Sequence, residues 1–280
     1  MPRRGVVSFD RVAELYDESR SVPAEVLRTA IDWALGSTSK GGSPLVLDVG
    51  VGTGITLDPL LTAGARVFGV DVSRRMLAKA QAKLQQRPDA ARVDLVCCDA
   101  LHLPFRRSSF DLIIAFNIFG FLSDERAFLL EGRRVSQPGG HLVAAGRYSL
   151  LGHTSLLPRY YENYRRHRKL WRRVASRLQG HRLKSLVHRF RQKLAERSGR
   201  RLVSLVDKTK LYWEQEIDLR VVLRHLEQRS LPSLWRIPEP THARIIRQLR
   251  LWIEEQRADR LVEKIRPSVE IRIYRLGGPG

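Results

Sequence analysis

The feature that most constrains the fold of this chain is a run of three alternating glycines directly after a strand-like segment. Residues 45–49 form an apolar run that contains β-branched valines and one aspartate, a pattern typical of a buried parallel strand. Gly50, Gly52 and Gly54 follow at once, and residues 55–61 can begin a helix. A strand, a glycine turn and a helix in this order form the opening of a nucleotide-cofactor unit. Glycine suits the turn because a residue without Cβ lets the backbone bend tightly and approach a ligand.

The spacing of the loop argues against a nicotinamide dinucleotide site. That fingerprint is G-x-G-x-x-G, and Ile55 occupies the place of its third glycine. No lysine follows the loop, as a phosphate-binding P-loop would require. Asp48 would lie beside a bound pyrophosphate, where its carboxylate would repel a phosphate and attract a cation. An adenosyl cofactor with an ammonium group and no phosphate fits this loop better.

Strand-like and helical segments alternate over residues 45–145, which predicts an α/β fold with a doubly wound, mostly parallel sheet. The expected strands are 45–49, 66–70, 92–97, 110–116 and 141–145. Helices are expected over 9–17, 24–35, 74–86, 124–135, 219–228 and 241–257. The strict alternation of residues 269–276 predicts a final strand.

An acidic residue stands at the end of each of the first three expected strands, where doubly wound sheets bind their ligands. Asp71 can accept hydrogen bonds from both ribose hydroxyls of an adenosine, and Asp99 can accept one from the adenine amino group. Each has a plainer alternative: Asp71 as a helix cap, Asp99 as a solvated loop residue, and Asp48 as a carboxylate that ties down loop amides.

These blocks together resemble the class I S-adenosylmethionine-dependent methyltransferases, in particular the branch that includes ubiquinone and menaquinone biosynthesis methyltransferases. The resemblance covers residues 9–147 and depends on these blocks: Phe9-Asp10 with Tyr16-Asp17 and Arg20, the Asp48-x-Gly50-x-Gly52-x-Gly54 loop, Gly69-Val70-Asp71-Val72-Ser73 with Met76-Leu77, Asp99-Ala100 with Leu103-Pro104-Phe105 and Ser109-Phe110-Asp111, and Arg134-Val135 with Pro138-Gly139-Gly140. It implies a Rossmann-like sheet of seven strands, the last one antiparallel, with helices on both faces and the cofactor at the C-terminal edge.

The resemblance also implies roles for individual residues. The cofactor-binding residues that it implies are Asp48, Gly50, Gly52 and Gly54 at the methionyl amine and carboxylate, Asp71 at the ribose, Asp99 and Ala100 at the adenine, Val72 and Met76 beside the adenine, Asn117 at the methyl-transfer site, and Tyr16 and Arg20 closing over the cofactor. The implied reaction is an in-line displacement that moves a methyl group from S-adenosyl-L-methionine to a small-molecule acceptor. Such a reaction needs alignment and water exclusion rather than a metal.

No catalytic base can be assigned from the sequence. His102, His153 and Asp17 are candidates, but nothing in their spacing singles one out. Cys97 and Cys98 are adjacent and would point to opposite faces of a strand, so they predict neither a disulfide nor a metal site. We therefore expect a reduced, cytoplasmic enzyme without a metal.

A strongly basic segment follows the expected sheet strands. Between residues 158 and 201, sixteen lysines and arginines accompany two glutamates, so this stretch contributes +14 to the net charge of +21. Apolar residues recur in it at helical spacing, which predicts a helical insertion after the fifth strand and divides the chain into 1–148, 149–205 and 206–280.

Three roles for the insertion are open. It can be a lid over the active site, a nucleic-acid surface, or a peripheral element on an anionic membrane surface. In the second case the aromatic residues Tyr160, Tyr161, Tyr164 and Trp171 would stack on bases. The alternative function is then an RNA-binding methyltransferase, or an inactive binding protein that keeps the fold.

Overall fold

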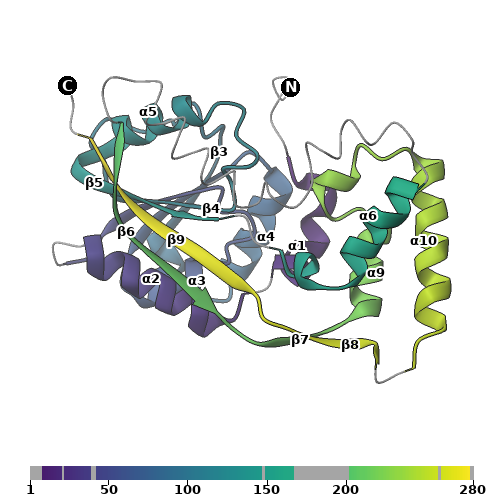
Figure 1. Ribbon diagram of the computed structural model, residues 1–280. Helices are drawn as coiled ribbons and strands as arrows, with labels where there is room; N and C mark the ends of the chain where they lie inside the picture. The colour runs from purple at the N-terminus through teal and green to yellow at the C-terminus, as the bar shows by residue number, and fades with distance from the viewer. Residues whose placement is uncertain are drawn as a thin grey trace.

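A seven-stranded sheet lies at the centre of the computed structural model, which describes residues 8–20, 22–38, 42–146, 149–166, 202–257 and 260–277 (Figure 1). The strand order is β3-β2-β1-β4-β5-β9-β6. The strands are β1 (Leu45–Val49), β2 (Arg66–Asp71), β3 (Val93–Cys97), β4 (Phe110–Phe116), β5 (Ser136–Ala145), β6 (Val203–Tyr212) and β9 (Ser268–Leu276). The pairs from β3 to β5 are parallel, and β9 is antiparallel to both of its neighbours. The predicted mostly parallel sheet with an antiparallel last strand is thus confirmed.

The register of the sheet brings the ends of the first three strands level. Val49 lies opposite Val70 in the pairing of β1 with β2, and Asp71 lies opposite Cys97 in the pairing of β2 with β3. Because parallel strands end at a common edge, the glycine loop and the acids at residues 71 and 99 meet at that edge.

Helices cover both faces of the sheet. The helices α2 (Ala24–Thr38), α3 (Leu57–Thr62) and α4 (Arg74–Leu84) contribute to the buried cluster on one face, and α5 (Glu125–Val135) contributes to the cluster on the other. Figure 1 shows α2 and α3 on the side opposite α5. The Ser73 hydroxyl accepts a hydrogen bond from the Met76 amide at 3.1 Å and starts α4, as its sequence position predicts.

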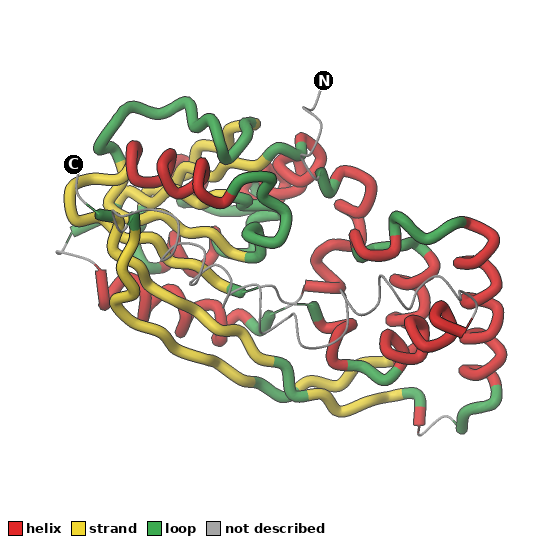
Figure 2. The backbone as a smooth tube through the Cα atoms, turned by 45° about the horizontal axis from the view of Figure 1, so that its top comes forward, coloured by secondary structure: helices red, strands yellow, loops and turns green. Residues whose placement is uncertain are grey.

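A second lobe stands beside the open edge of the strands. It consists of α6 (Leu156–Arg166), α9 (Leu219–Glu227), α10 (Glu239–Glu254) and a two-stranded sheet of β7 (Gln215–Asp218) and β8 (Val262–Ile265). The strand β6 leads into β7, and β8 leads into β9, so a two-stranded ribbon runs from the large sheet into the second lobe (Figure 2).

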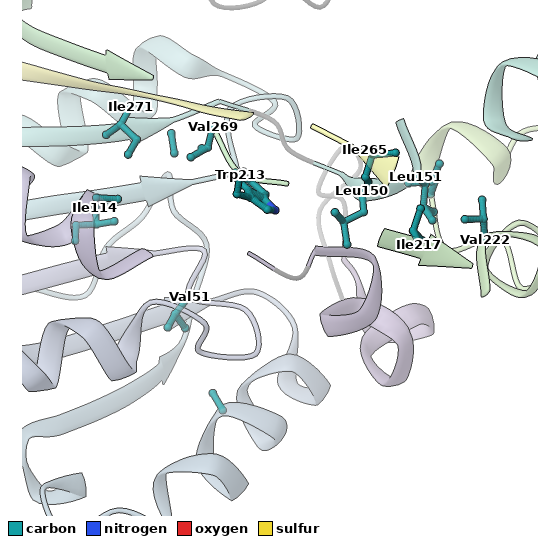
Figure 3. Close-up of a cluster of buried hydrophobic side chains, with 14 of the residues drawn as sticks. Val51, Ile114, Leu150, Leu151, Trp213, Ile217, Val222, Ile265, Val269 and Ile271 are labelled. Carbon is teal, nitrogen blue, oxygen red and sulfur yellow. The ribbon is translucent and has the colours of Figure 1, made fainter. Parts of the chain in front are cut away.

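The apolar core continues from the sheet into the second lobe. Trp213, 8% exposed, lies where the ribbon passes from one lobe to the other, between Val269 of β9 and Leu150 (Figure 3). Ile217 and Ile265 continue the cluster on the second-lobe side. Buried apolar side chains therefore pack the two lobes together on the side where β6 and β9 run into the second lobe.

Several features of the C-terminal half differ from the sequence expectation, and other expectations concern residues that the structure does not describe. No strand was expected at residues 203–212, where β6 forms. Tyr160 and Tyr164 are buried in the second lobe, so the hypothesis that these two rings stack on bases is wrong. Residues 167–201, with Trp171 and most of the predicted helical insertion, lie outside the described residues. The three-part division of the chain stays a prediction, although α9 and α10 pack against α6 rather than against the large sheet.

In the described part of the chain, no helix combines the length and the apolar character that crossing a membrane requires.

A buried polar pair inside the second lobe supplies a stability prediction. The Tyr160 hydroxyl lies 2.6 Å from His242 Nδ1, and both side chains are at most 3% exposed. We expect Tyr160→Phe to lower the free energy of unfolding by about 1–3 kcal/mol, because it leaves a buried ring nitrogen without its partner. Urea unfolding measures this change. The matched variant Tyr161→Phe removes a hydroxyl that bonds Ser233 at an exposed position and should cost less than about 0.5 kcal/mol. Equal losses in the two variants would contradict the assignment.

Candidate cofactor site

The glycine loop closes against the neighbouring strand and leaves its own backbone open to a cavity. The Gly50 and Val51 amides both donate to the Val70 carbonyl, at 2.8 and 3.0 Å. Gly50 has φ +75°, and a Cβ built on it would lie 2.1 Å from Cγ2 of Ile118. Glycine suits this position because it adopts a positive φ without strain and leaves room for the Ile118 side chain.

Asp71 is the acid most closely tied to the loop. Its carboxylate accepts hydrogen bonds from the Gly52 amide at 3.0 Å and from the Ser73 amide at 2.8 Å. Burial raises the pKa of Asp71 above its ordinary value, while the Ser73 and Gly52 hydrogen bonds oppose that rise. One carboxylate therefore fixes the loop and the start of α4, and it also lines the cavity.

Asp99 and Asn117 occupy the ends of the neighbouring strands. The Asp99 carboxylate accepts a hydrogen bond from the Leu101 amide at 3.0 Å, which fixes the turn after β3. Asn117 has φ +60° directly after β4, and its amide donates to the Ala145 carbonyl at 3.4 Å. Both residues line the cavity.

The cavity spans the open edge of the strands and encloses about 790 Å³, part of it open to solvent. The predicted site residues that line it are Tyr16, Gly50, Gly52, Asp71, Val72, Met76, Asp99, Ala100 and Asn117. The lining residues outside that predicted set are Phe9, Val49, Val70, Cys98, Leu101, Phe116, Ile118, Phe121, Leu122 and Ser123. The apolar run through residues 112–122 was the available signal for part of this second group, because it continues past the end of β4.

Asp48 does not reach the cavity. Its side chain is 1% exposed and accepts a hydrogen bond from the Thr56 hydroxyl behind the loop. Burial raises the pKa of the Asp48 carboxyl to about 7; the Thr56 bond opposes the rise, and the negative charge of Asp71 adds to it. The Asp48 carboxylate thus contacts the Thr56 hydroxyl and no described loop amide, and its predicted place at the methionyl amine stays a prediction. Gly54 is likewise outside the lining, since a Cβ there would meet Leu57 at 2.8 Å.

The raised pKa of Asp48 predicts a pH dependence of folding. A carboxyl with a pKa of about 7 in the folded chain, against an ordinary 3.8, stabilises the fold at low pH and loses that contribution as the pH rises through 7. Asp48→Asn cannot ionise, and its amide oxygen can still accept the Thr56 bond. We expect the stability of this variant relative to wild type to increase by about 1–3 kcal/mol between pH 5 and pH 8. Urea unfolding of the cofactor-free protein at both pH values tests this. A difference in free energy of unfolding between variant and wild type that is the same at both pH values would contradict it.

The N-terminal segment packs over the cavity. It consists of a 3-10 helix, η1 (Asp10–Leu15), followed by α1 (Tyr16–Arg20), where a helix over 9–17 was expected. The Phe9 ring meets Tyr16 edge to face at 5.7 Å and Phe121 at 4.9 Å. Asp17 accepts a hydrogen bond from the Thr53 hydroxyl of the glycine loop. Arg20 ends α1, and its side chain lies outside the described part of the structure.

The three candidates for a catalytic base are all outside the cavity lining of the described residues. Asp17 is bound to Thr53 and lies 2.7 Å from Lys83 Nζ. His102 is largely exposed, 3.9 Å from Asp99. His153 lies in η3 (Leu150–His153), and burial lowers its pKa. The structure therefore selects none of them.

Comparisons with known proteins match the part of the chain that builds this edge. The family profile described as a methyltransferase domain matches residues 47–144. A demethylmenaquinone methyltransferase of Lactiplantibacillus plantarum is 37% identical over 142 residues, which cover 48% of this chain and 59% of that protein. Residues 47–144 of this chain thus match a methyltransferase domain.

The relatives that resemble the methyltransferase domain are longer than the matched region. The biotin biosynthesis bifunctional protein BioHC of Cellvibrio japonicus is 33% identical over 138 residues, or 49% of this chain and only 26% of that protein. The matches thus span at most about 59% of these two relatives. The solved structure of the [4+2]-cyclase SpnF is 17% identical, with a TM-score of 0.52 over 99% of this chain and 100% of that one. That likeness shows the fold alone, because one fold supports different reactions.

Proposed function

We propose that this protein binds S-adenosyl-L-methionine in the cavity and transfers its methyl group to a small-molecule acceptor. The observation that carries the proposal is the Asp71 carboxylate, held at the cavity wall by the Gly52 amide. Oxygen atoms of a carboxylate fixed in this way can accept further hydrogen bonds from two adjacent ribose hydroxyls.

The charge of the cavity fits this cofactor better than a phosphate-bearing one. Of the described residues that line the cavity, two are aspartates and none is a lysine or arginine. The adenosyl sulfonium carries positive charge, whereas a dinucleotide would bring phosphates into a cavity whose described lining supplies no cationic side chain. The glycine loop adds the close backbone approach that a bound amino acid moiety needs.

Different residues would then bind different parts of the cofactor. Asp71 would bind the ribose, Asp99 and Ala100 the adenine amino edge, and Val72 and Met76 the flat faces of the ring. The loop at Gly50 and Gly52 would face the methionyl end. When bound, the cofactor supplies a methyl carbon activated by a sulfonium, so the protein's contribution is alignment and the exclusion of water.

The remaining wall of the cavity favours an uncharged, apolar acceptor. Phe9, Phe116, Ile118, Phe121 and Leu122 supply this wall. The similarity to demethylmenaquinone methyltransferases supports a small-molecule acceptor, and no described contact favours RNA. Of the net charge of +21, most of the contribution from the basic segment lies in residues 167–201, outside the described residues. An anionic partner through residues 158–201, and a cytoplasmic or peripheral location, therefore stay predictions.

The acceptor class can be tested by incubating the protein with methyl-labelled S-adenosylmethionine and separate pools of possible acceptors. The pools are a demethylnaphthoquinol, an organic-solvent extract of cells, and total RNA. We expect label in one of the first two pools and none in RNA. Label in RNA alone would contradict the small-molecule proposal while leaving the cofactor assignment intact.

A further inference from the structure

The N-terminal segment of residues 8–20, called the strap below, presents three different faces to three parts of the molecule. Phe9 and Tyr16, seven residues apart, face the cavity. Figure 1 places α1 between the sheet and the lobe of α9 and α10.

The first polar face of the strap binds the glycine loop and α4, which border the cavity, through three acids. Asp10 accepts hydrogen bonds from the Ser73 hydroxyl at 2.6 Å and the Arg75 amide at 3.1 Å. Glu14 pairs with Lys79, and Asp17 bonds Thr53 and pairs with Lys83. These partners are the glycine loop and α4, the same elements that Asp71 holds in place.

The second polar face contacts the second lobe through one acid, Glu18, and one arginine, Arg11. Glu18 lies 2.6 Å from the Arg224 guanidinium and 3.2 Å from Nε2 of the fully buried His225, both on α9. The Arg11 guanidinium lies 5.1 Å from the ring centroid of Trp235, and the Phe9 ring lies 5.8 Å from the same ring. Glu18 is thus the strap's one described carboxylate that contacts α9.

We propose that Glu18 is a positioning residue, which docks the second lobe against the strap and thereby over the methyl-transfer site when the cofactor is bound. This inference rests on the proposed function. A bound cofactor would contact Tyr16 and the glycine loop, and both are bonded to or continuous with the strap. A strap ordered in this way presents Glu18 to α9, whereas the opposite side of the second lobe is already fixed by the core around Trp213.

Coupling of this kind is reciprocal. If cofactor binding favours docking of α9, then breaking the docking contact must weaken cofactor binding by the same factor. We expect Glu18→Gln to lower the affinity for S-adenosylhomocysteine about fivefold to tenfold, the low end of typical coupling. Arg224→Ala, which breaks the contact from the other lobe, should have a similar effect.

The test is calorimetric titration of the full chain with S-adenosylhomocysteine, together with hydrogen exchange of the α9 amides with and without that ligand. Wild type should bind and show slower exchange in α9 when bound, and Glu18→Gln should lose most of that protection. Glu25→Gln is the matched control, because Glu25 is exposed in α2 and forms no ion pair among the described residues. The charge-reversed pair Glu18→Lys with Arg224→Glu should recover part of the affinity, which a merely unfolded strap would not do.

The outcomes separate the two proposals. If wild type binds the ligand and Glu18→Gln binds it equally well with unchanged α9 exchange, the docking role is refuted and the cofactor proposal stands. If wild type does not bind the ligand at all, the cofactor proposal itself fails, and the docking role fails with it.

Discussion

Asp71→Ala is expected to lower the affinity for S-adenosylmethionine by roughly 100-fold. The side chain would bind the ribose, and hydrogen bonds to a charged group contribute about 1.5–3 kcal/mol each, so the loss of about 3 kcal/mol is a moderate estimate. The substitution also removes the acceptor of the Gly52 amide, which leaves the loop less fixed before the ligand arrives. Isothermal titration calorimetry measures the change directly.

A control variant must show whether lower affinity comes from losing a contact with the ligand or merely from losing one negative charge near the large sheet. Asp94→Ala serves this purpose, because Asp94 is an exposed aspartate on β3 whose nearest cation, on Arg66, is 3.7 Å away. We expect Asp94→Ala to bind like wild type. Thermal unfolding should show both variants folded, since burial already disfavours the ionised form of Asp71. Equal affinities for Asp71→Ala and wild type would refute the ribose assignment.

Gly50→Ala is expected to damage both the fold and the site. An alanine with φ near +75° costs about 1–2 kcal/mol of backbone strain, and its Cβ would overlap Cγ2 of Ile118. We expect the free energy of unfolding to fall by about 2–4 kcal/mol and cofactor affinity to fall at least about tenfold, because either the loop or the Ile118 side chain, both of which line the cavity, must shift. Urea unfolding and calorimetry on one preparation report both effects.

The matched control for this change is Gly64→Ala. Gly64 has φ +81°, but a Cβ there meets nothing within 4 Å, so the variant carries the backbone strain without the overlap. It should lose about 1–2 kcal/mol of stability and bind the cofactor normally. If Gly50→Ala had the same free energy of unfolding and the same cofactor affinity as Gly64→Ala, the close approach of the loop to Ile118 would contribute neither to stability nor to binding.

The parts of the site that the sequence predicts are those governed by local rules. β1 and β4 have the predicted bounds, because buried parallel strands are continuous apolar runs bounded by turn residues. Asp71 and Asp99 were found because parallel strands end at one edge, so acids placed at strand ends must come together. The same reasoning does not account for the position of Asp48. Alternation along a strand predicts which face of the sheet a side chain lies on, but not that a hydrogen bond from Thr56 keeps the Asp48 carboxylate buried.

The parts that the sequence does not predict depend on contacts between distant segments. β6 is an edge strand with a register shift between Leu205 and Asp207, and most of its side chains are exposed, so it lacks the alternation that marks a half-buried strand. Phe9 lines the cavity in contact with Phe121, which lies more than a hundred residues later in the chain. Tyr160 stands next to arginines in the sequence, yet it is buried because α9 and α10 close around α6.

The central claim is that a phosphate-free adenosyl cofactor occupies the edge where Asp71 meets the glycine loop, and the most direct test is calorimetric titration of wild type with two ligands. S-adenosylmethionine should bind at a single site, and NAD⁺ should release no heat at the same concentrations. Binding of NAD⁺ with no response to S-adenosylmethionine would contradict the account.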